Sequence, residues 1–428
     1  LLHFRKHHHR FATRAMPFRR GAESLIETNN VRSFLRWNGD TVLVASLSGI
    51  YIYLAGQDRC TEMLGLPPAL DFLKRDAVWS LAKDRRGRLW IGTGETGLIV
   101  TDLRSGKFLR FSELPRLPRA LHSMRVRKLS CAPGGKMLLG TWEGIFAIDA
   151  DSLDLDSGSD VFVAKLQKGR DARQLNSDLI MAMHFDSAHR LWVGTDRGLR
   201  VYDPESGSQK VWRRVKAEKR GLLSDDIRAI YEDRNRRLWL GTHGSGLHLF
   251  HPENGIEDVY DVSDGLSDNI VYAIEEDGKG NLWLSTHRGL SRLDLSTGQV
   301  RKYDLSDGLQ DYEFNTGASL ALPDGRLLFG GVKGFNVFHP DSVHDILEAP
   351  NVVITRLLVF EKEHPFSRRG VTLPHDQNYV TLEFAALSHY RADENRYAYM
   401  LEGVDKAWVH PGSRRFASYS DLSPGKYM

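Results

Sequence analysis

The sequence has few cysteines, no long apolar run and little net charge. Among its 428 residues are only two cysteines, Cys60 and Cys131, which give neither a disulfide framework nor zinc-ligand spacing. No window approaches the roughly 18 apolar residues of a membrane-spanning helix, and residues 1–20 lack the apolar region of a signal peptide. The net charge of +3 is too near neutral to indicate nucleic-acid binding. These exclusions leave an ordinary globular protein with a buried core as the expected class.

Glycine and aromatic residues are plentiful, with 39 Gly, 9 Trp, 14 Tyr and 19 Phe. This composition favours many short strands and tight turns over helices. The chain begins with Leu and stops at SPGKYM within an apparent strand. We therefore expect a fragment of a longer protein, in which the lack of a targeting signal says little about location.

One hairpin motif recurs seven times, with an apolar pair, two small or hydroxyl residues (Gly-Thr in four copies), a short polar turn, a second Gly and another strand. Its copies lie about 44–54 residues apart: TVLVASLSGIYIYL (41–54), LWIGTGETGLIVTDL (89–103), MLLGTWEGIFAIDA (137–150), LWVGTDRGLRVYDP (191–204), LWLGTHGSGLHLFHP (238–252), LWLSTHRGLSRLDL (282–295) and LLFGGVKGFNVFHP (327–340). A period of this length, built from strands, is typical of a β-propeller. The repeat predicts an all-β fold with a seven-bladed β-propeller over residues 31–343.

Each repeat predicts four antiparallel strands. An alternating strand and an acidic turn precede the motif, as in IRAIYEDRNRR, and a short strand such as QKVWRRV follows it. We expect the Trp or Leu to fill the space between blades. The first Gly suits a crowded inner position, and the second suits a turn with positive φ.

Closing the ring requires a fourth strand in the last blade. Residues 1–30 either supply it, from within about residues 1–20, or belong to a preceding blade, and the sequence leaves both readings open.

The pattern changes after Pro350. Residues 350–428 alternate with period two, and turn signals recur every 8–12 residues, which predicts an immunoglobulin-like β-sandwich truncated at its C-terminal side.

Together these segments resemble the two-component regulator propeller followed by the Y-Y-Y domain. The last repeat is similar to the terminal blade of this family through Glu313–Asn315 and Phe329–Gly331. The Y-Y-Y resemblance rests on a Tyr-rich stretch with Tyr390, Tyr397, Tyr399, Gly403, Trp408, Tyr419, Leu422–Gly425 and Tyr427. The first and third repeats depart from the family pattern, because Leu43 and Leu138 replace the Trp.

The resemblance implies the periplasmic part of a bacterial inner-membrane receptor. In this family a transmembrane helix follows and leads to a histidine kinase, a hybrid kinase or a diguanylate cyclase, none of which lies in these residues. It implies ligand sensing, a phosphorelay or cyclase output, and a homodimer formed through the C-terminal sandwich. A propeller enzyme acting on polysaccharide and a protein-interaction scaffold are the alternatives.

Propeller geometry selects one face for a ligand. The link into the first strand of a blade and the turn between its second and third strands share that face, where irregular polar and aromatic side chains gather. The candidate ligand-binding residues are Trp142, Glu143, Asp196, Arg197, Asp226, His243, Asn269, His287, Arg288, Tyr312, Asn315 and Lys333. Such a set suits a polar ligand such as an oligosaccharide or a peptide. Each residue taken singly is also explained as a solvated turn residue.

The sequence nominates no catalytic residue, cofactor or metal site. GTGETG (92–97) matches a nucleotide-binding pattern, but the same positions recur inside the other hairpins, whereas the pattern requires a strand leading into a helix. His7–His9 has no companion acid or cysteine nearby, and the basic stretch RRVKAEKR lacks the context of a nucleic-acid site.

Overall fold

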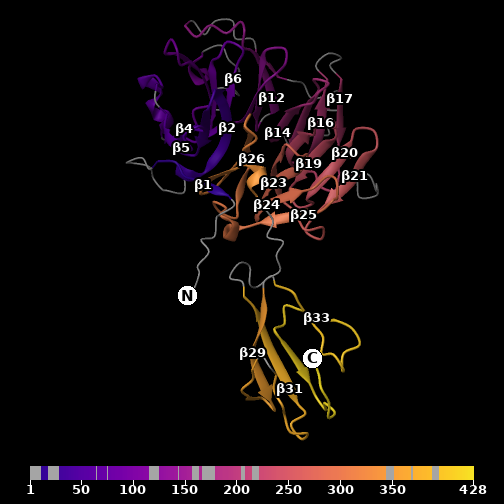
Figure 1. The fold of residues 1–428 in the computed structure, drawn as a ribbon. Coiled ribbons are helices and arrows are strands. Elements are labelled where there is room, and N and C mark those ends of the chain that lie inside the picture. Colours follow the sequence, from indigo (N-terminus) through magenta and orange to yellow (C-terminus); the bar gives the residue numbers. More distant parts are fainter. Residues whose placement is uncertain are drawn as a thin grey trace. The chain divides into compact units, whose positions relative to one another are not determined.

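The computed structural model describes residues 11–17, 28–63, 65–74, 76–114, 125–142, 144–156, 163–165, 179–203, 208–214, 221–343, 351–367, 370–387 and 395–428. The chain divides into two compact units, Leu1–Val343 and His344–Met428, each of which is described by itself (Figure 1).

Seven four-stranded antiparallel sheets form the described part of the first unit, and we call them blades I to VII in chain order. Blade I contains β2 (Val31–Asn38), β3 (Thr41–Ser46), β4 (Gly49–Leu54) and β5 (Arg59–Glu62). Blade II contains β6 (Val78–Lys83), β7 (Leu89–Thr93), β8 (Leu98–Asp102) and β9 (Lys107–Arg110). Blade III contains β10 (Val126–Cys131), β11 (Lys136–Thr141), β12 (Gly144–Asp149) and β13 (Val163–Lys165). Blade IV contains β14 (Ile180–Phe185), β15 (Leu191–Thr195), β16 (Gly198–Tyr202) and β17 (Gln209–Trp212).

The remaining blades follow the same plan. Blade V contains β18 (Ile227–Glu232), β19 (Leu238–Thr242), β20 (Leu247–His251) and β21 (Gly255–Tyr260). Blade VI contains β22 (Val271–Glu276), β23 (Leu282–Thr286), β24 (Gly289–Leu293) and β25 (Val300–Tyr303). Blade VII contains β26 (Phe314–Ala321), β27 (Leu327–Gly331), β28 (Gly334–Phe338) and, from the N-terminal segment, β1 (Ala12–Arg14).

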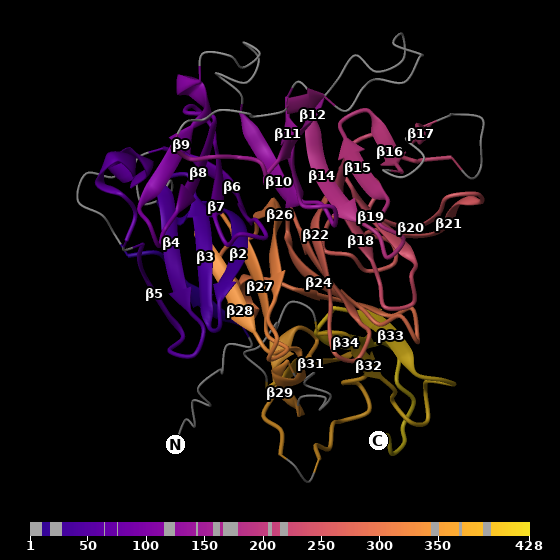
Figure 2. The same ribbon diagram turned by 90° about the horizontal axis from the view of Figure 1, so that it is seen from above.

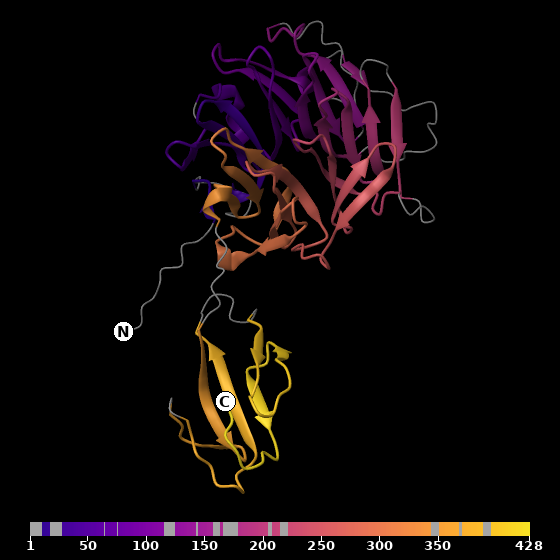
Figure 3. The same cartoon turned by 45° about the vertical axis from the view of Figure 1, so that its right-hand side comes forward.

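The first strand of every blade lies at the inside of the ring. Each inner strand lies next to the inner strands of the two neighbouring blades, and β2 lies next to both β26 and β6, so the ring is closed. Figure 2 shows β5, β9, β17 and β21 at the outside of the propeller, and Figure 3 shows blade VII (orange) beside blade I (indigo). The predicted all-β propeller is confirmed, including the blades that contain Leu43 and Leu138.

The N-terminal strand β1 completes blade VII. It pairs antiparallel with β28, with Ala12 opposite Val337 and Arg14 opposite Phe335. The side chain of Asn336, fully buried in β28, donates hydrogen bonds to Thr13 Oγ1 and to the carbonyl of Gly308, both at 3.1 Å. The pairing joins the two ends of the propeller and covers the edge of β28, so that β1 becomes the outer strand of this blade.

Hydrophobic residues are buried between the blades, with one cluster at each of the seven blade-to-blade contacts. Trp90, Trp192, Trp239 and Trp283 are at most 1% exposed and lie in these clusters, as the repeat predicts. Burying a large aromatic side chain stabilises the fold by several kcal/mol, about 3 to 5 kcal/mol when judged by truncation to alanine.

Close backbone approach explains the glycines of the motif, the first of which is replaced by Ala45 in blade I and by Ser285 in blade VI. A Cβ on Gly194 would lie 2.7 Å from the carbonyl oxygen of Ile227, the first residue of the next inner strand. The second glycine has φ between +74° and +125° in all seven blades. At Gly198, for example, a Cβ would lie 2.4 Å from the carbonyl oxygen of Trp212. The predicted turn role of this glycine is confirmed.

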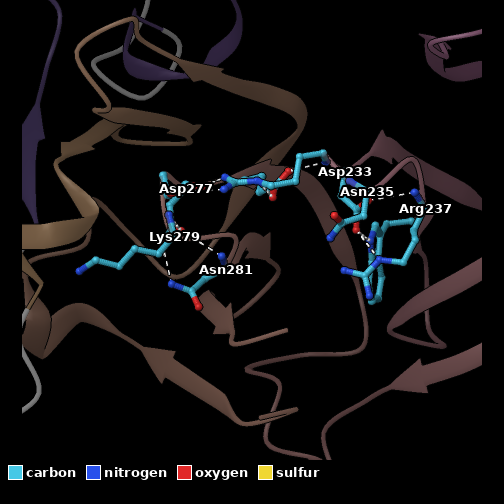
Figure 4. Close-up of polar contacts among 10 residues, drawn as sticks. Asp233, Asn235, Arg237, Asp277, Lys279 and Asn281 are labelled. Carbon is cyan, nitrogen blue, oxygen red and sulfur yellow. Dashed lines mark hydrogen bonds and ion pairs between the residues drawn. The ribbon is translucent and has the colours of Figure 1, made fainter. Parts of the chain in front are cut away.

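The acidic turn of four blades binds the tryptophan that follows it. In blade V, Asp233 Oδ2 accepts hydrogen bonds from Trp239 Nε1 (3.0 Å) and Arg237 Nε (2.7 Å), while Oδ1 accepts the backbone N–H groups of Asn235 and Arg237 (both 2.9 Å). Asp277 is bonded in the same way in blade VI (Figure 4). Asp84 and Asp186 bind their tryptophans likewise. These aspartates are at most 5% exposed, so the spacing Asp-x5-Trp is a structural element of the repeat.

The described residues of the second unit form two sheets. The four-stranded sheet has the order β30 (Lys362–Glu363), β29 (Val352–Val359), β31 (Val380–Ala386) and β34 (Phe416–Tyr419), and β32 (Tyr397–Tyr399) pairs with β33 (Val409–Gly412). Phe384, Tyr397 and Ala417 form its core. Tyr419 donates a 2.7 Å hydrogen bond to Asp405 Oδ2. Two of the predicted Tyr residues thus hold this unit together, whereas Tyr390 lies outside the described residues.

Helical structure is scarce in the described part of the chain. It includes the 3-10 segments η1 (Pro68–Lys74), η2 (Phe111–Glu113), η3 (Leu305–Asp307) and η4 (Pro340–Ser342). Across the described ranges, no helix has the length and apolar character needed to cross a membrane.

Candidate functional site

The candidate residues gather at one end of the blades. The start of each inner strand pairs with the end of the second strand, as Val126 does with Thr141, and Thr141 also faces Gly144 across the turn between the second and third strands. The link into the blade and that turn therefore meet at the same end, which we call the bulge end. The Asp–Trp turns lie at the opposite end.

Each inner strand has a β-bulge at the bulge end. In blades I to VI one residue is skipped directly after the first pair of the strand. These six residues, which we call the bulge ring, are Arg32, Trp79, Arg127, Met181, Arg228 and Tyr272. In blade VII the irregularity extends from Phe314 to Ser319. A bulge re-aims a side chain and is over-represented beside functional sites.

Trp79 lies between basic residues of its two neighbouring blades. The guanidinium carbon of Arg32 (blade I) lies 4.7 Å from the centre of the Trp79 ring, and that of Arg127 (blade III) lies 4.9 Å from it. Residues of three consecutive blades therefore converge at one place. Burial, together with the charge of Arg127, lowers the pKa of Arg32 to about 10, although Glu313 opposes this effect.

Lys128 spans the ring from blade III to blade VII. Its Nζ donates a 3.2 Å hydrogen bond to the carbonyl oxygen of Thr316, within the irregular segment of β26. In blades I, II, IV, V and VI the equivalent position is Ser or Ala, and it faces a Gly, Ala or Ser of the second strand. Burial and the nearby charges of Arg127 and Arg32 lower the pKa of Lys128 to about 8.

Three predicted residues, Asp226, His287 and Asn315, contact members of the bulge ring. Asp226 forms a two-pronged ion pair with Arg228, with both N–O distances at 2.7 Å. His287 is exposed, and its Nδ1 lies 3.4 Å from the hydroxyl of Tyr272.

Asn315 connects blade VII to blade I. Its Nδ2 donates to Asn30 Oδ1 (3.0 Å) and to the carbonyl of Val31 (2.7 Å), and its Oδ1 accepts a 3.2 Å bond from Arg32. The structure thus places this candidate residue in the closure of the ring.

The other described candidate residues lie at the bulge end and have other surroundings. Trp142 is 49% exposed, and Arg125 lies over its ring at 4.7 Å. Asn269 Oδ1 accepts the backbone N–H of Val262, and Lys333 pairs with Asp311 at 2.6 Å. Asp196 is half-buried, and the exposed candidates are Arg197, His243, Arg288 and Tyr312. Glu143 lies outside the described residues.

A buried carboxyl group lies between blades VI and VII. Glu275, on the inner strand β22, accepts a 2.7 Å hydrogen bond from the hydroxyl of Ser319 on β26, and burial raises its pKa to about 7. Neither Glu275 nor the bulge ring was among the residues selected from the sequence. The signal in the sequence is a bulky residue between the buried Val or Ile and a small residue, as in VRS, VWS, IRA and VYA.

Glu275→Gln is expected to change how stability depends on pH. The folded state of the wild-type protein holds the Glu275 proton up to about pH 7, whereas the unfolded chain loses it near 4.5, so this group makes stability fall between those two pH values. The Gln variant lacks that decline, which we expect to amount to about 1–3 kcal/mol. Chemical denaturation of both proteins at pH 5 and pH 8 measures this change in the free energy of unfolding. The exposed Glu253→Gln is the control, and an unchanged pH profile in Glu275→Gln would contradict the prediction.

Sequence profiles of two families match the chain. The two component regulator propeller matches residues 73–95, 221–244 and 265–288, each of which runs from the link before an inner strand to the end of the second strand or just beyond it. The Y_Y_Y domain matches residues 388–428. The chain therefore carries matches to both families, in three of its repeats and in its Tyr-rich segment, where the sequence predicted them.

Individual relatives belong to bacterial signalling systems. The extracellular domain of a hybrid two-component system from B. thetaiotaomicron is 25% identical and superimposes with a TM-score of 0.73 over 93% of this chain and 52% of its own length. Histidine kinase P4 of Formosa agariphila is 27% identical over 267 residues, which are 59% of this chain and 19% of that kinase. The chain thus spans about half of the first relative and about a fifth of the second.

A third similarity concerns the fold alone. Virginiamycin B lyase from Staphylococcus aureus is 12% identical, with a TM-score of 0.51 over 72% of this chain and 94% of the lyase. This lyase shares the propeller architecture, and at this identity nothing follows about the chemistry of the present chain.

Proposed function

We propose that this chain is the ligand-sensing, extracytoplasmic part of a membrane-bound bacterial receptor with a histidine kinase output. The observation that carries the proposal is the similarity, over 93% of the chain, to the extracellular domain of a hybrid two-component system. Histidine kinase P4 supports the same output and gives no support to a diguanylate cyclase. In such a receptor the propeller and the Y_Y_Y domain lie in the periplasm, and a membrane helix joins them to the kinase.

The bulge end supports the ligand-binding part of the proposal. It gathers half-buried basic residues, an exposed tryptophan and an exposed histidine on a rigid closed ring. Clefts and loops on a rigid scaffold are where binding residues concentrate. The ligand affects signalling only if its affinity differs between two states of the receptor, and a homodimer that associates through the Y_Y_Y domain provides two such states.

Autophosphorylation of the full-length receptor in nanodiscs tests this function. We expect at least one member of a panel of oligosaccharides and peptides to bind and to change the autophosphorylation rate about 5-fold or more. Asp226→Asn, at the bulge end, is expected to weaken the response, whereas the exposed Glu253→Gln is the matched control. Panel members that bind without affecting the kinase would favour the scaffold alternative. Conversion of an oligosaccharide into products would favour the enzyme alternative.

A further inference from the structure

Four basic side chains meet at the bulge end with too few acids to balance them. Arg32, Arg127, Lys128 and Arg228 come from blades I, III and V. Within the part of the chain that the structure describes, only Arg228 has an ion pair, because its guanidinium binds both oxygens of Asp226. Among the described residues, the remaining three cations contact the Trp79 ring, the Asn315 amide and the carbonyl oxygen of Thr316 rather than a carboxylate.

Mutual repulsion among these cations is visible in their pKa values. Besides burial, the charge of Arg127 lowers the pKa of both Arg32 and Lys128, and the charge of Arg228 lowers the pKa of Arg127. Glu313 acts against this on Arg32, but its own side chain is exposed, and no ion pair joins these two side chains among the described residues. Unpaired charges that are partly removed from water destabilise a fold unless an opposite charge approaches them.

Trp79 fixes the spacing of the two arginines. Both guanidinium groups lie within 5 Å of its ring centre, at 4.7 and 4.9 Å, so they are held near one another despite their like charge. Arg32 Nε is buried and has no hydrogen-bond partner in the described structure. A planar guanidinium held in this way presents its N–H donors in the geometry that a carboxylate or sulfate group accepts.

An aromatic surface lies on the same blade. Trp142 belongs to the turn between β11 and β12 of blade III, at the end where Arg127 begins the inner strand. Half of this side chain is exposed, and Arg125 occupies a place over its ring at 4.7 Å. An exposed indole beside cations offers an apolar face to one part of a ligand and hydrogen-bond donors to an acidic part.

We propose that Arg32, Arg127 and Lys128 bind the acidic group of an anionic saccharide, with Trp142 contacting its sugar ring. The inference rests on the proposed function, because the anion is taken to be the signal that the receptor senses. The acidic group is a carboxylate or a sulfate. The experiment below uses a separate ligand for each of these two groups.

The test uses calorimetric titration of the full-length receptor in nanodiscs at fixed ionic strength. The probes are trigalacturonate for the carboxylate, sodium sulfate and a sulfated trisaccharide for the sulfate, and maltotriose as the neutral sugar. We expect one acidic trisaccharide to bind, and Arg127→Gln and Lys128→Met each to weaken that binding about 10-fold or more. Arg59→Gln and Lys136→Met, which remove exposed cations elsewhere on blades I and III, are the matched controls.

Thermal unfolding without any ligand separates binding from a structural role. Because the two substitutions relieve like-charge repulsion, we expect Arg127→Gln and Lys128→Met to melt at or above the wild-type temperature. Lower melting temperatures with unchanged binding of the acidic trisaccharide would overturn the proposal, as would a wild-type receptor that responds to none of the acidic probes. A third outcome is that both variants lose anion binding, while the anion does not change the autophosphorylation rate of the wild-type receptor. This result would support the anion site and refute the sensor function.

Discussion

Phe11→Ala is expected to destabilise the propeller by about 3–5 kcal/mol, the largest effect of a single substitution considered. The Phe11 side chain is 1% exposed, and its ring centre lies 4.6 Å from that of Phe338, 5.1 Å from that of Tyr303 and 6.2 Å from that of Trp283. It directly precedes β1, so it fixes the closing strand between blades VI and VII. Truncation leaves a cavity at this contact and loosens the pairing of β1 with β28.

Urea denaturation followed by tryptophan fluorescence measures this effect. Phe366→Ala, which removes a ring that is 41% exposed in the second unit, is the control. Deleting residues 1–14 is expected to leave β28 as an unpaired edge and to cause self-association, measured by light scattering. Unchanged stability in Phe11→Ala together with a monomeric deletion variant would contradict the closing role of this segment and favour its assignment to a preceding blade.

Asp233→Ala is expected to destabilise the propeller by about 2–4 kcal/mol. The substitution removes a side chain that is 3% exposed and accepts four hydrogen bonds, and it leaves Trp239 Nε1 and two backbone N–H groups without partners. Asp40→Ala, at the exposed turn between the first two strands of blade I, is the matched control and is expected to cost less than about 0.5 kcal/mol.

The same aspartate gives the effect a pH dependence. Burial by itself raises the pKa of Asp233, but the hydrogen bonds from Trp239 and Arg237 outweigh it, so that the pKa is lowered from 3.8. The stabilisation is therefore present above about pH 4 and is lost as the pH falls through the lowered pKa. The difference between the wild-type protein and Asp233→Ala, measured by denaturation, should narrow in acid. A difference that stays constant down to pH 2 would show that the carboxylate charge does not stabilise the turn.

The repeat made the scaffold predictable, because residues with a fixed role recur at a fixed spacing. The positions occupied by Trp239 and Gly246 in blade V recur in every blade. Seven copies of the motif were therefore enough to assign the large buried position and the positive-φ turn. Asp233 was recognised as a turn residue but not as the partner of Trp239, since the pattern alone does not reveal which side chain bonds to the indole.

The basic residues of the site were harder to find. A period-two pattern contains no bulge, so the alternation did not single out Arg32 and Arg127, although the bulge aims them at Trp79 on the blade between them. Lys128 reaches a blade that lies almost 190 residues away in the sequence, at Thr316. The turn residue Asn315 was selected for its polarity, but its hydrogen bonds to Asn30 and Val31 depend on the closure of the ring.

The placement of β1 has a mechanical consequence. The chain enters the propeller through Ala12–Arg14 and leaves it after β28, so both connections are made at blade VII. Because β1 and β28 are antiparallel, a pull on the segment before Ala12 and on the segment after Phe338 acts at the same end of the strand pair. Such a load separates the three residue pairs one after another instead of shearing them together. Tension along the chain would therefore be released at this strand pair first, while the other six blades carry almost none of it.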